Sequence, residues 1–152
     1  MMDWVRTEPD HLILMNNHLA SQKILGNGSL LEVAEDSALA PLLATHARTL
    51  RNEVGDPILC VGVWPQWPGV SSVWMLVTAE ALLDHSIKVI RGSWRFMRGI
   101  VQRDGLHRLQ AYVYPSHSAG VRFAEHYGFL NEGTMKQFSQ EKEDLCLYAR
   151  TF

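Results

Sequence analysis

The chain has 152 residues, a length that favours a single domain over residues 1–152 whose core needs neither a disulfide nor a metal. Its net charge of -2 gives no reason to expect nucleic acid or an anionic membrane surface as a general partner. Cys60 and Cys146 lie in apolar runs and are expected to be buried, reduced thiols. With neither a leader-like start nor an apolar stretch approaching the ~20 residues of a membrane span, the sequence predicts a cytoplasmic protein.

The chain opens with a short apolar strand at Trp4, and helices follow it. Thr7 is a suitable cap for a helix whose first turn contains Pro9, and this helix is expected to end before Gly26. A capping-box spacing then predicts a second helical region over residues 29–43.

From His46 onward the pattern changes to that of strands. Residues 46–54 and 57–64 predict a hairpin, and residues 70–77 predict a further strand. Between them, Trp64 and Trp67 lie in a predicted aromatic loop. This loop is interpreted as a lid over a substrate, as an anchor for a second subunit in a homodimer, or as a segment folded onto its own core.

The next segment is an amphipathic helix that ends at Gly105. A core-facing stripe is predicted from the residues Ile87, Ile90, Trp94, Met97 and Val101. One position further on, the same spacing places cations on one side of the helix, namely Lys88, Arg91, Arg95 and Arg98. This basic stripe predicts either a solvated face or a site for phosphates or an acidic partner.

The last third of the chain predicts a strand over residues 109–114, a helix over 116–126 and a hairpin formed by 134–140 and 145–150. His-x-x-x-His and carboxylate spacings typical of metal sites are missing from the sequence, so no metal is expected.

This order of elements resembles the GNAT N-acetyltransferase family. The similar segments are Trp4–Asp10, Ala79-Glu80, Val113 with His117, Tyr127-Gly128-Phe129 and Glu132-Gly133. The resemblance implies an α+β fold with a mixed sheet of about seven strands flanked by about four helices. A fainter similarity is to the small acetyltransferase-like proteins of some tailed phages.

The resemblance also implies a function: acyl-CoA-dependent N-acyl transfer, with acetyl-CoA as co-substrate, directly to an unidentified amine. By position, Glu80 is the expected base and Tyr127 a candidate acid. The positions implied to bind the cofactor are Val77, Thr78, Ser86, Lys88, Arg91 and His117.

Two departures from the family's pattern weigh against catalysis. The segment from Leu82 to Lys88, where the family has a glycine-rich phosphate loop, contains no glycine, and Asp84 there would repel phosphates. The family's usual tyrosine acid is replaced by Ala124, for which Tyr114, Ser116, Ser118 or Tyr127 is a candidate substitute. The alternative prediction is therefore a catalytically degenerate GNAT-fold binding or structural protein, for example a phage component.

Overall fold

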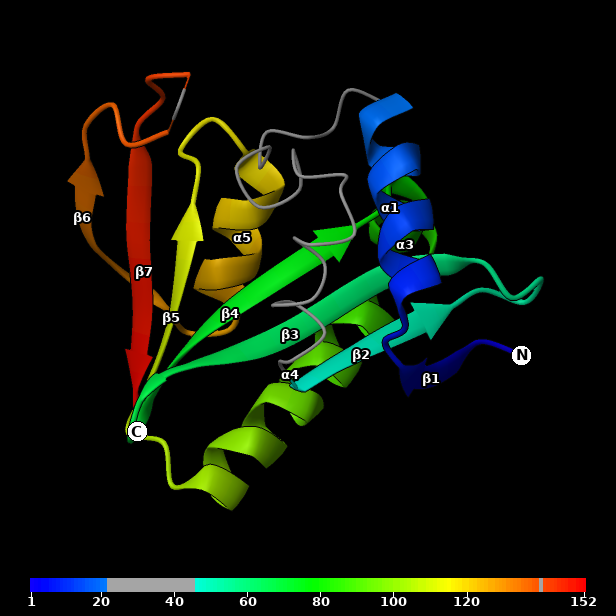
Figure 1. The fold of residues 1–152 in the computed structure, drawn as a ribbon, viewed down its shortest axis with the longest axis horizontal. Helices are drawn as coiled ribbons and strands as arrows, with labels where there is room; N and C mark the ends of the chain where they lie inside the picture. Colours follow the sequence, from blue (N-terminus) through cyan, green and yellow to red (C-terminus); the bar gives the residue numbers. More distant parts are fainter. Residues whose placement is uncertain (22–45, 140) are drawn as a thin grey trace.

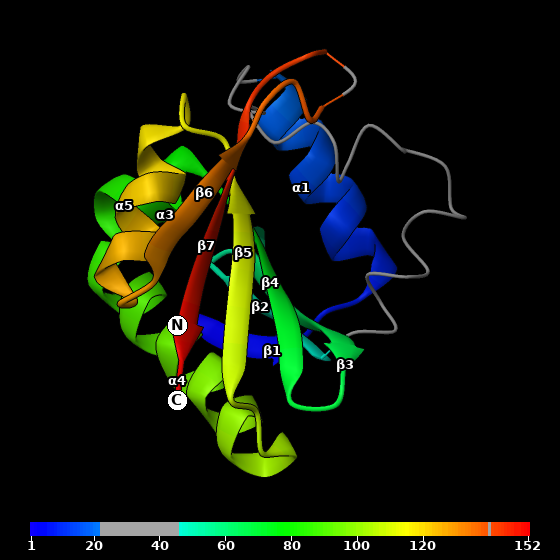
Figure 2. The same ribbon diagram turned by 90° about the vertical axis from the view of Figure 1, so that its left-hand side faces the viewer.

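A computed structural model describes residues 1–21, 46–139 and 141–152. The helix predicted over 29–43 lies outside these ranges. The described residues form one seven-stranded sheet with helices on both faces (Figures 1 and 2). The strands are β1 (Asp3–Arg6), β2 (His46–Arg51), β3 (Pro57–Trp67), β4 (Val70–Val77), β5 (Arg108–Val113), β6 (Leu130–Met135) and β7 (Leu145–Thr151). The helices are α1 (Pro9–Ser21), α3 (Ala79–Asp84), α4 (Ser86–Asp104) and α5 (Ser118–His126).

The sheet consists of two antiparallel halves joined by one parallel contact. The strand order is β1-β2-β3-β4-β5-β7-β6, and β4 with β5 is the parallel pair. A parallel connection needs a crossover, which α3 and α4 supply between these two strands. Figure 2 shows α4 and α5 on one face of the sheet and α1 on the other.

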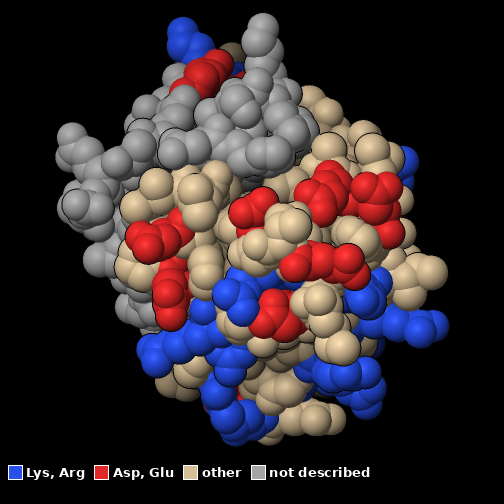
Figure 3. Space-filling view, turned by 90° about the vertical axis from the view of Figure 1, so that its right-hand side faces the viewer, with Lys and Arg blue, Asp and Glu red and all other residues tan. Residues whose placement is uncertain are grey.

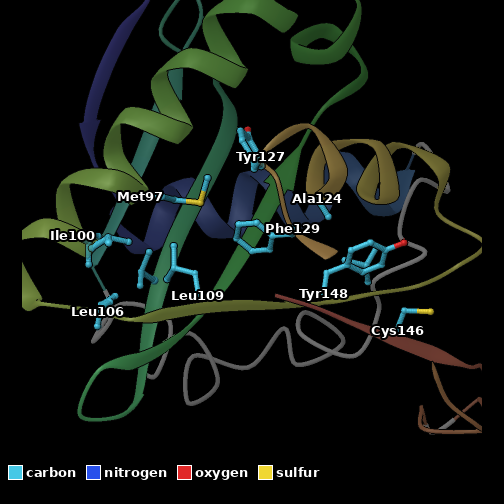
Figure 4. Packing of buried hydrophobic residues seen from close by; sticks show 12 residues of the cluster. Met97, Ile100, Leu106, Leu109, Ala124, Tyr127, Phe129, Cys146 and Tyr148 are labelled. Atoms are coloured by element: carbon cyan, nitrogen blue, oxygen red, sulfur yellow. The ribbon is translucent and has the colours of Figure 1, made fainter. Parts of the chain in front are cut away.

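The core follows from the apolar runs in the sequence. In β3 the side chains of Leu59, Cys60 and Val61 are fully buried, as expected for a central strand covered on both faces. A second cluster fills the space between the sheet and the helices α4 and α5 (Figure 4). Cys60 and Cys146 are buried free thiols, as predicted. None of the helices in the described ranges is both long and apolar enough to cross a bilayer.

The core-facing stripe predicted for the long helix is confirmed except at its first residue. Met97 and Val101 are buried and Ile90 and Trp94 pack against the same cluster, whereas Ile87 is 65% exposed. Ile87 is the second residue of α4, directly after the break that follows the end of α3 at Asp84. Helical spacing predicts which residues share a face but not where along the helix that face becomes buried.

Two segments predicted from turn residues also differ in the structure. Residues 64–69 are not an aromatic loop, because β3 continues to Trp67 and pairs with β4 across an irregularity after Pro65. Trp64 and Trp67 are therefore exposed strand residues. The strand predicted over 134–140 instead begins at Leu130 and ends at Met135, and the left-handed backbone of Gln137 (φ 51°) interrupts any continuation.

Candidate functional site

The parallel strands β4 and β5 separate shortly after they meet. Their pairing is confined to Val70 with Arg108, Ser71 with Leu109 and Ser72 with Gln110. The last pair is fixed by a hydrogen bond of 3.4 Å from Gln110 Nε2 to Ser72 Oγ. Beyond this point, the facing edges of the two strands carry main-chain donors and acceptors that are not used in pairing between them.

A cavity of about 360 Å³ occupies this separation. Its walls come from both strands, from α5 and from Met97 of α4, and of the described residues that line it none is charged. Two neighbouring strand residues, Val73 and Trp74, line it from opposite faces of the sheet, so the cavity passes through the sheet. An apolar cavity of this kind, with few polar groups, is typical of a small-molecule site.

His117 contributes one of the buried polar atoms of this cavity. It is the residue before α5, and its Nδ1 atom is buried and has no hydrogen-bond partner within the described ranges. Burial lowers the pKa of the imidazole below its ordinary value of 6.5, so the ring is neutral at neutral pH. Gly120 makes room for it, because a methyl group there would lie 2.6 Å from Nδ1.

Tyr127 contributes the second buried polar atom. Its hydroxyl has no hydrogen-bond partner that satisfies normal geometry within the part of the chain described, and burial raises its pKa to about 12. The nearby Ser93 hydroxyl, whose own proton is donated to the Val89 carbonyl, opposes this rise. Tyr127 therefore stays protonated across the physiological range.

Of the site residues predicted near the end of β4, only some lie at the cavity. Val77 lines the cavity, whereas the Thr78 hydroxyl caps α3 by accepting from the Ala81 amide and donates to the Ile58 carbonyl. Glu80 is exposed in the first turn of α3 and accepts a hydrogen bond of 3.2 Å from Asn52 Nδ2. It is not among the cavity-lining residues.

The start of α4 carries the predicted basic residues on the surface. Lys88 and Arg91 are exposed and Ser86 is half-buried, but the cap position of α4 is His85, whose side chain makes no capping hydrogen bond. Leu83 just before it is 80% exposed. Figure 3 views the molecule from the side of the β2–β3 turn, where basic side chains gather in the lower half and acidic ones above them.

Several lining residues were not identified from the sequence. Tyr112 and Phe138 stack with ring centroids 6.2 Å apart and line the cavity, although they are far apart in the chain. No motif spacing indicates such a pair, because it depends on the β5–β7 pairing and the turn after β6. Ala124, recognised as the position without a tyrosine, lines the cavity as well. A group of His, Cys, Asp or Glu side chains suited to a metal is not found among the described residues.

Known structures share this architecture, whereas no protein-family model and no curated protein sequence matches the chain. A putative GNAT-family acetyltransferase from Desulfovibrio desulfuricans superposes with a TM-score of 0.73 at 20% identity, covering 99% of each chain. A GNAT-family acetyltransferase from Bacillus anthracis gives 0.74 at 11% identity, covering 99% of this chain and 94% of that one.

A third similar structure is RimL, a ribosomal L7/L12 alpha-N-protein acetyltransferase in complex with coenzyme A. It gives a TM-score of 0.75 at 14% identity, covering 99% of this chain and 94% of that one. The chain therefore has the GNAT acetyltransferase fold, as the order of its elements predicted.

Proposed function

We propose that this protein is an acyl-CoA-dependent N-acyltransferase that transfers its acyl group directly to an amine. The observation that carries the proposal is the apolar cavity between the separated strands β4 and β5, with His117 Nδ1 and the Tyr127 hydroxyl buried in its walls without partners. A buried polar atom without a hydrogen-bond partner destabilises the folded protein by ~1–3 kcal/mol. A ligand that forms a hydrogen bond with this atom removes that penalty.

The residues present fit the uncharged part of acetyl-CoA. The amides of its pantetheine arm need partners, which the free strand edges and His117 offer, and the apolar walls suit its carbon chain. The diphosphate would lie at the amino end of α4, near Lys88 and Arg91, where the helix dipole favours an anion. Ser86 and Thr78 complete the proposed binding region.

The proposed reaction forms a bond between the amine nitrogen and the thioester carbonyl carbon and breaks the carbon–sulfur bond. The amine must lose a proton, and the leaving thiolate must gain one. We assign the first role to Glu80, acting directly or through one water, and the second to Tyr127, whose raised pKa keeps its proton in place. The charge on the carbonyl oxygen is stabilised by a free amide on the edge of β4.

A second candidate function is that of a binding or structural protein that has kept the fold without catalysis, for example in a phage particle. The observation that favours it is the junction between α3 and α4, where exposed Leu83 and Asp84 take the place of glycines that would let the backbone approach a diphosphate. Ala124 in the cavity wall, in place of a tyrosine, also favours this second function.

Thermal unfolding in the presence of acetyl-CoA distinguishes the two functions. A ligand at one hundred times its dissociation constant stabilises the folded state by ~2.7 kcal/mol, so millimolar acetyl-CoA is expected to raise the midpoint. Adenosine diphosphate serves as the control for binding through the diphosphate alone. If neither acetyl-CoA nor free CoA moves the midpoint, and calorimetric titration gives no heat, the second function replaces the first.

A further inference from the structure

A second concavity, of about 370 Å³, lies where the end of β7 meets the second half of α4 (Figure 2). It shares no lining residue with the cavity between β4 and β5. Its lining combines aromatic, basic, aliphatic and amide side chains, namely Trp94, Arg98, Val101, Gln102, Arg150 and Phe152. Two of these side chains are positively charged and no described side chain among them is acidic, so the concavity favours an anionic ligand.

The guanidinium of Arg150 is held firmly at one side of this concavity. It lies over the rings of Trp94 and Phe152, 4.6 and 5.2 Å from their centroids, and its Nη1 atom donates a hydrogen bond of 2.7 Å to the Tyr127 carbonyl. Within the described ranges, no other hydrogen bond and no ion pair of Arg150 is found. A guanidinium has five N–H donors, so most of them are free to bind an oxyanion at little cost in entropy.

Arg98 contributes the second charge and has no such packing role. It is exposed, lies one turn after Trp94 on α4, and makes no hydrogen bond or ion pair with any described residue. Its charge and that of Arg150 face the same concavity, where like charges repel each other. An oxyanion bound by both removes this repulsion and accepts the charge-assisted hydrogen bonds that arginine forms with phosphate.

The charges and the rings together restrict the ligand. A phosphate monoester carries a charge of about -1.5 to -2 at pH 7, which matches two arginines better than the single charge of a carboxylate does. The ring of Phe152 is 49% exposed beside them and offers a surface for a flat group.

We propose that this concavity binds a phosphate monoester whose organic part is a flat ring, with the phosphate on Arg98 and Arg150 and the ring against Phe152. The site does not depend on the proposed function. It also differs from the proposed diphosphate site, because Arg98 lies ~15 Å along α4 from Lys88.

Calorimetric titration of the intact protein with phenyl phosphate tests this site. Phenyl phosphate should bind ~2–10-fold more tightly than inorganic phosphate, which lacks the ring, and phenol, which lacks the charge, should bind more weakly still. Saturating acetyl-CoA should leave its affinity unchanged. Adenosine monophosphate and phosphotyrosine then compare the two sources of such a group, a nucleotide and a modified protein side chain, and the tighter binder identifies the source.

Three results would overturn the proposal. Phenyl phosphate that neither gives heat nor raises the unfolding midpoint at millimolar concentration would show that there is no site. Inorganic phosphate binding as tightly as phenyl phosphate would remove the role of the ring. Competition between acetyl-CoA and phenyl phosphate would place the phosphate at the thioester site instead.

Variants locate the ligand. Arg98→Gln removes one charge and is expected to weaken phenyl phosphate binding by ~10–100-fold. Arg95→Gln is the matched control, because Arg95 is exposed on the same helix but does not line the concavity, and it should change the affinity little. Equal losses in the two variants would indicate diffuse surface charge and contradict the site. Phe152→Ala should abolish the preference for phenyl phosphate over inorganic phosphate, and a preference that persists contradicts the placement of the ring.

Discussion

At the scale of single residues, Tyr127 is held in place more firmly than its missing hydrogen bond suggests. Its ring stacks against Trp94 and Phe123, each with centroids 6.0 Å away, and its carbonyl accepts a hydrogen bond of 2.7 Å from Arg150 Nη1. The guanidinium of Arg150 also lies over the Trp94 ring, 4.6 Å from its centroid. A side chain fixed by packing keeps its hydroxyl in position without a partner for that hydroxyl.

Tyr127→Phe is expected to lower the rate of acyl transfer by ~10²–10⁴, because it removes the proton donor for the thiolate. Stability should change little or rise, since the substitution removes a buried, unpaired hydroxyl without changing the ring. Initial rates and thermal unfolding measure the two effects. Tyr148→Phe is the control, because this buried tyrosine belongs to the same cluster but does not line the cavity. Equal rates in both variants would remove Tyr127 from the mechanism.

Glu80→Gln tests the proposed base. It keeps the size of the side chain and a partner for Asn52, so affinity for acetyl-CoA should remain nearly unchanged while the rate falls by ~10²–10⁴. Asn52→Ala, which removes the hydrogen bond but keeps the carboxylate, should lower the rate much less. A Glu80→Gln protein as active as the parent would mean that the proton leaves the amine by another route.

At the scale of elements, the packing of α4 depends on one of its two glycines. A methyl group at Gly92 would lie 2.4 Å from the Trp4 ring of β1, whereas a methyl group at Gly99 would meet nothing within 4 Å. Gly92→Ala is therefore expected to lower the free energy of unfolding by ~1–3 kcal/mol through overpacking. Gly99→Ala should instead raise it by ~0.5–1 kcal/mol, the usual gain of alanine over glycine in a helix. Urea unfolding of both variants measures this difference in sign.

The basic stripe on α4 gives a second prediction for the same helix. Replacing Lys88 and Arg91 with Glu should weaken CoA binding strongly, and the same change at Arg95 and Arg98 should weaken it much less. The reason is distance, because Arg98 lies ~15 Å along the helix from Lys88 and the Debye length at physiological salt is ~8 Å. Titrations with free CoA compare the pairs. Equal losses would assign the stripe to a macromolecular partner instead.

Some of the helices and strands could be predicted from the sequence, and others could not. The β2–β3 hairpin, β4 and α5 were predicted within a few residues, because alternation and helical spacing are local signals. The extension of β3 to Trp67, which pairs with Val70, was not predicted, because Pro65 and Pro68 indicate a loop. Val77 and His117, which were predicted to bind the cofactor, line the cavity, but the Tyr112–Phe138 pair was missed because it joins residues distant in the chain.

At the scale of the whole molecule, two buried groups predict how stability depends on alkaline pH. Burial raises the pKa of Cys60 from 9.0 and that of Tyr127 from 10.0, each to about 12. Both groups keep their protons longer in the folded state than in the unfolded state, so the unfolded state releases protons first. The stability is fully present below about pH 9 and is lost as the pH rises toward 12.

Urea unfolding between about pH 8 and pH 11 measures this loss. Cys60→Ala and Tyr127→Phe are each expected to flatten the dependence by removing one of the two groups, although Cys60→Ala also lowers stability at all pH values because it leaves a small cavity. A parent protein whose urea midpoint is constant over this range would contradict the burial of both groups.

The short contact between β4 and β5 has a consequence for how the chain folds. Within the first half, β2, β3 and β4 follow one another through short turns, so these three strands can form from local contacts. The pairs from Val70 with Arg108 to Ser72 with Gln110 instead close a loop that contains α3 and α4. Three residue pairs offset little of the entropy of closing that loop, and we therefore expect β2, β3 and β4 to assemble early and β5 to join them late, with the joining step limiting the folding rate.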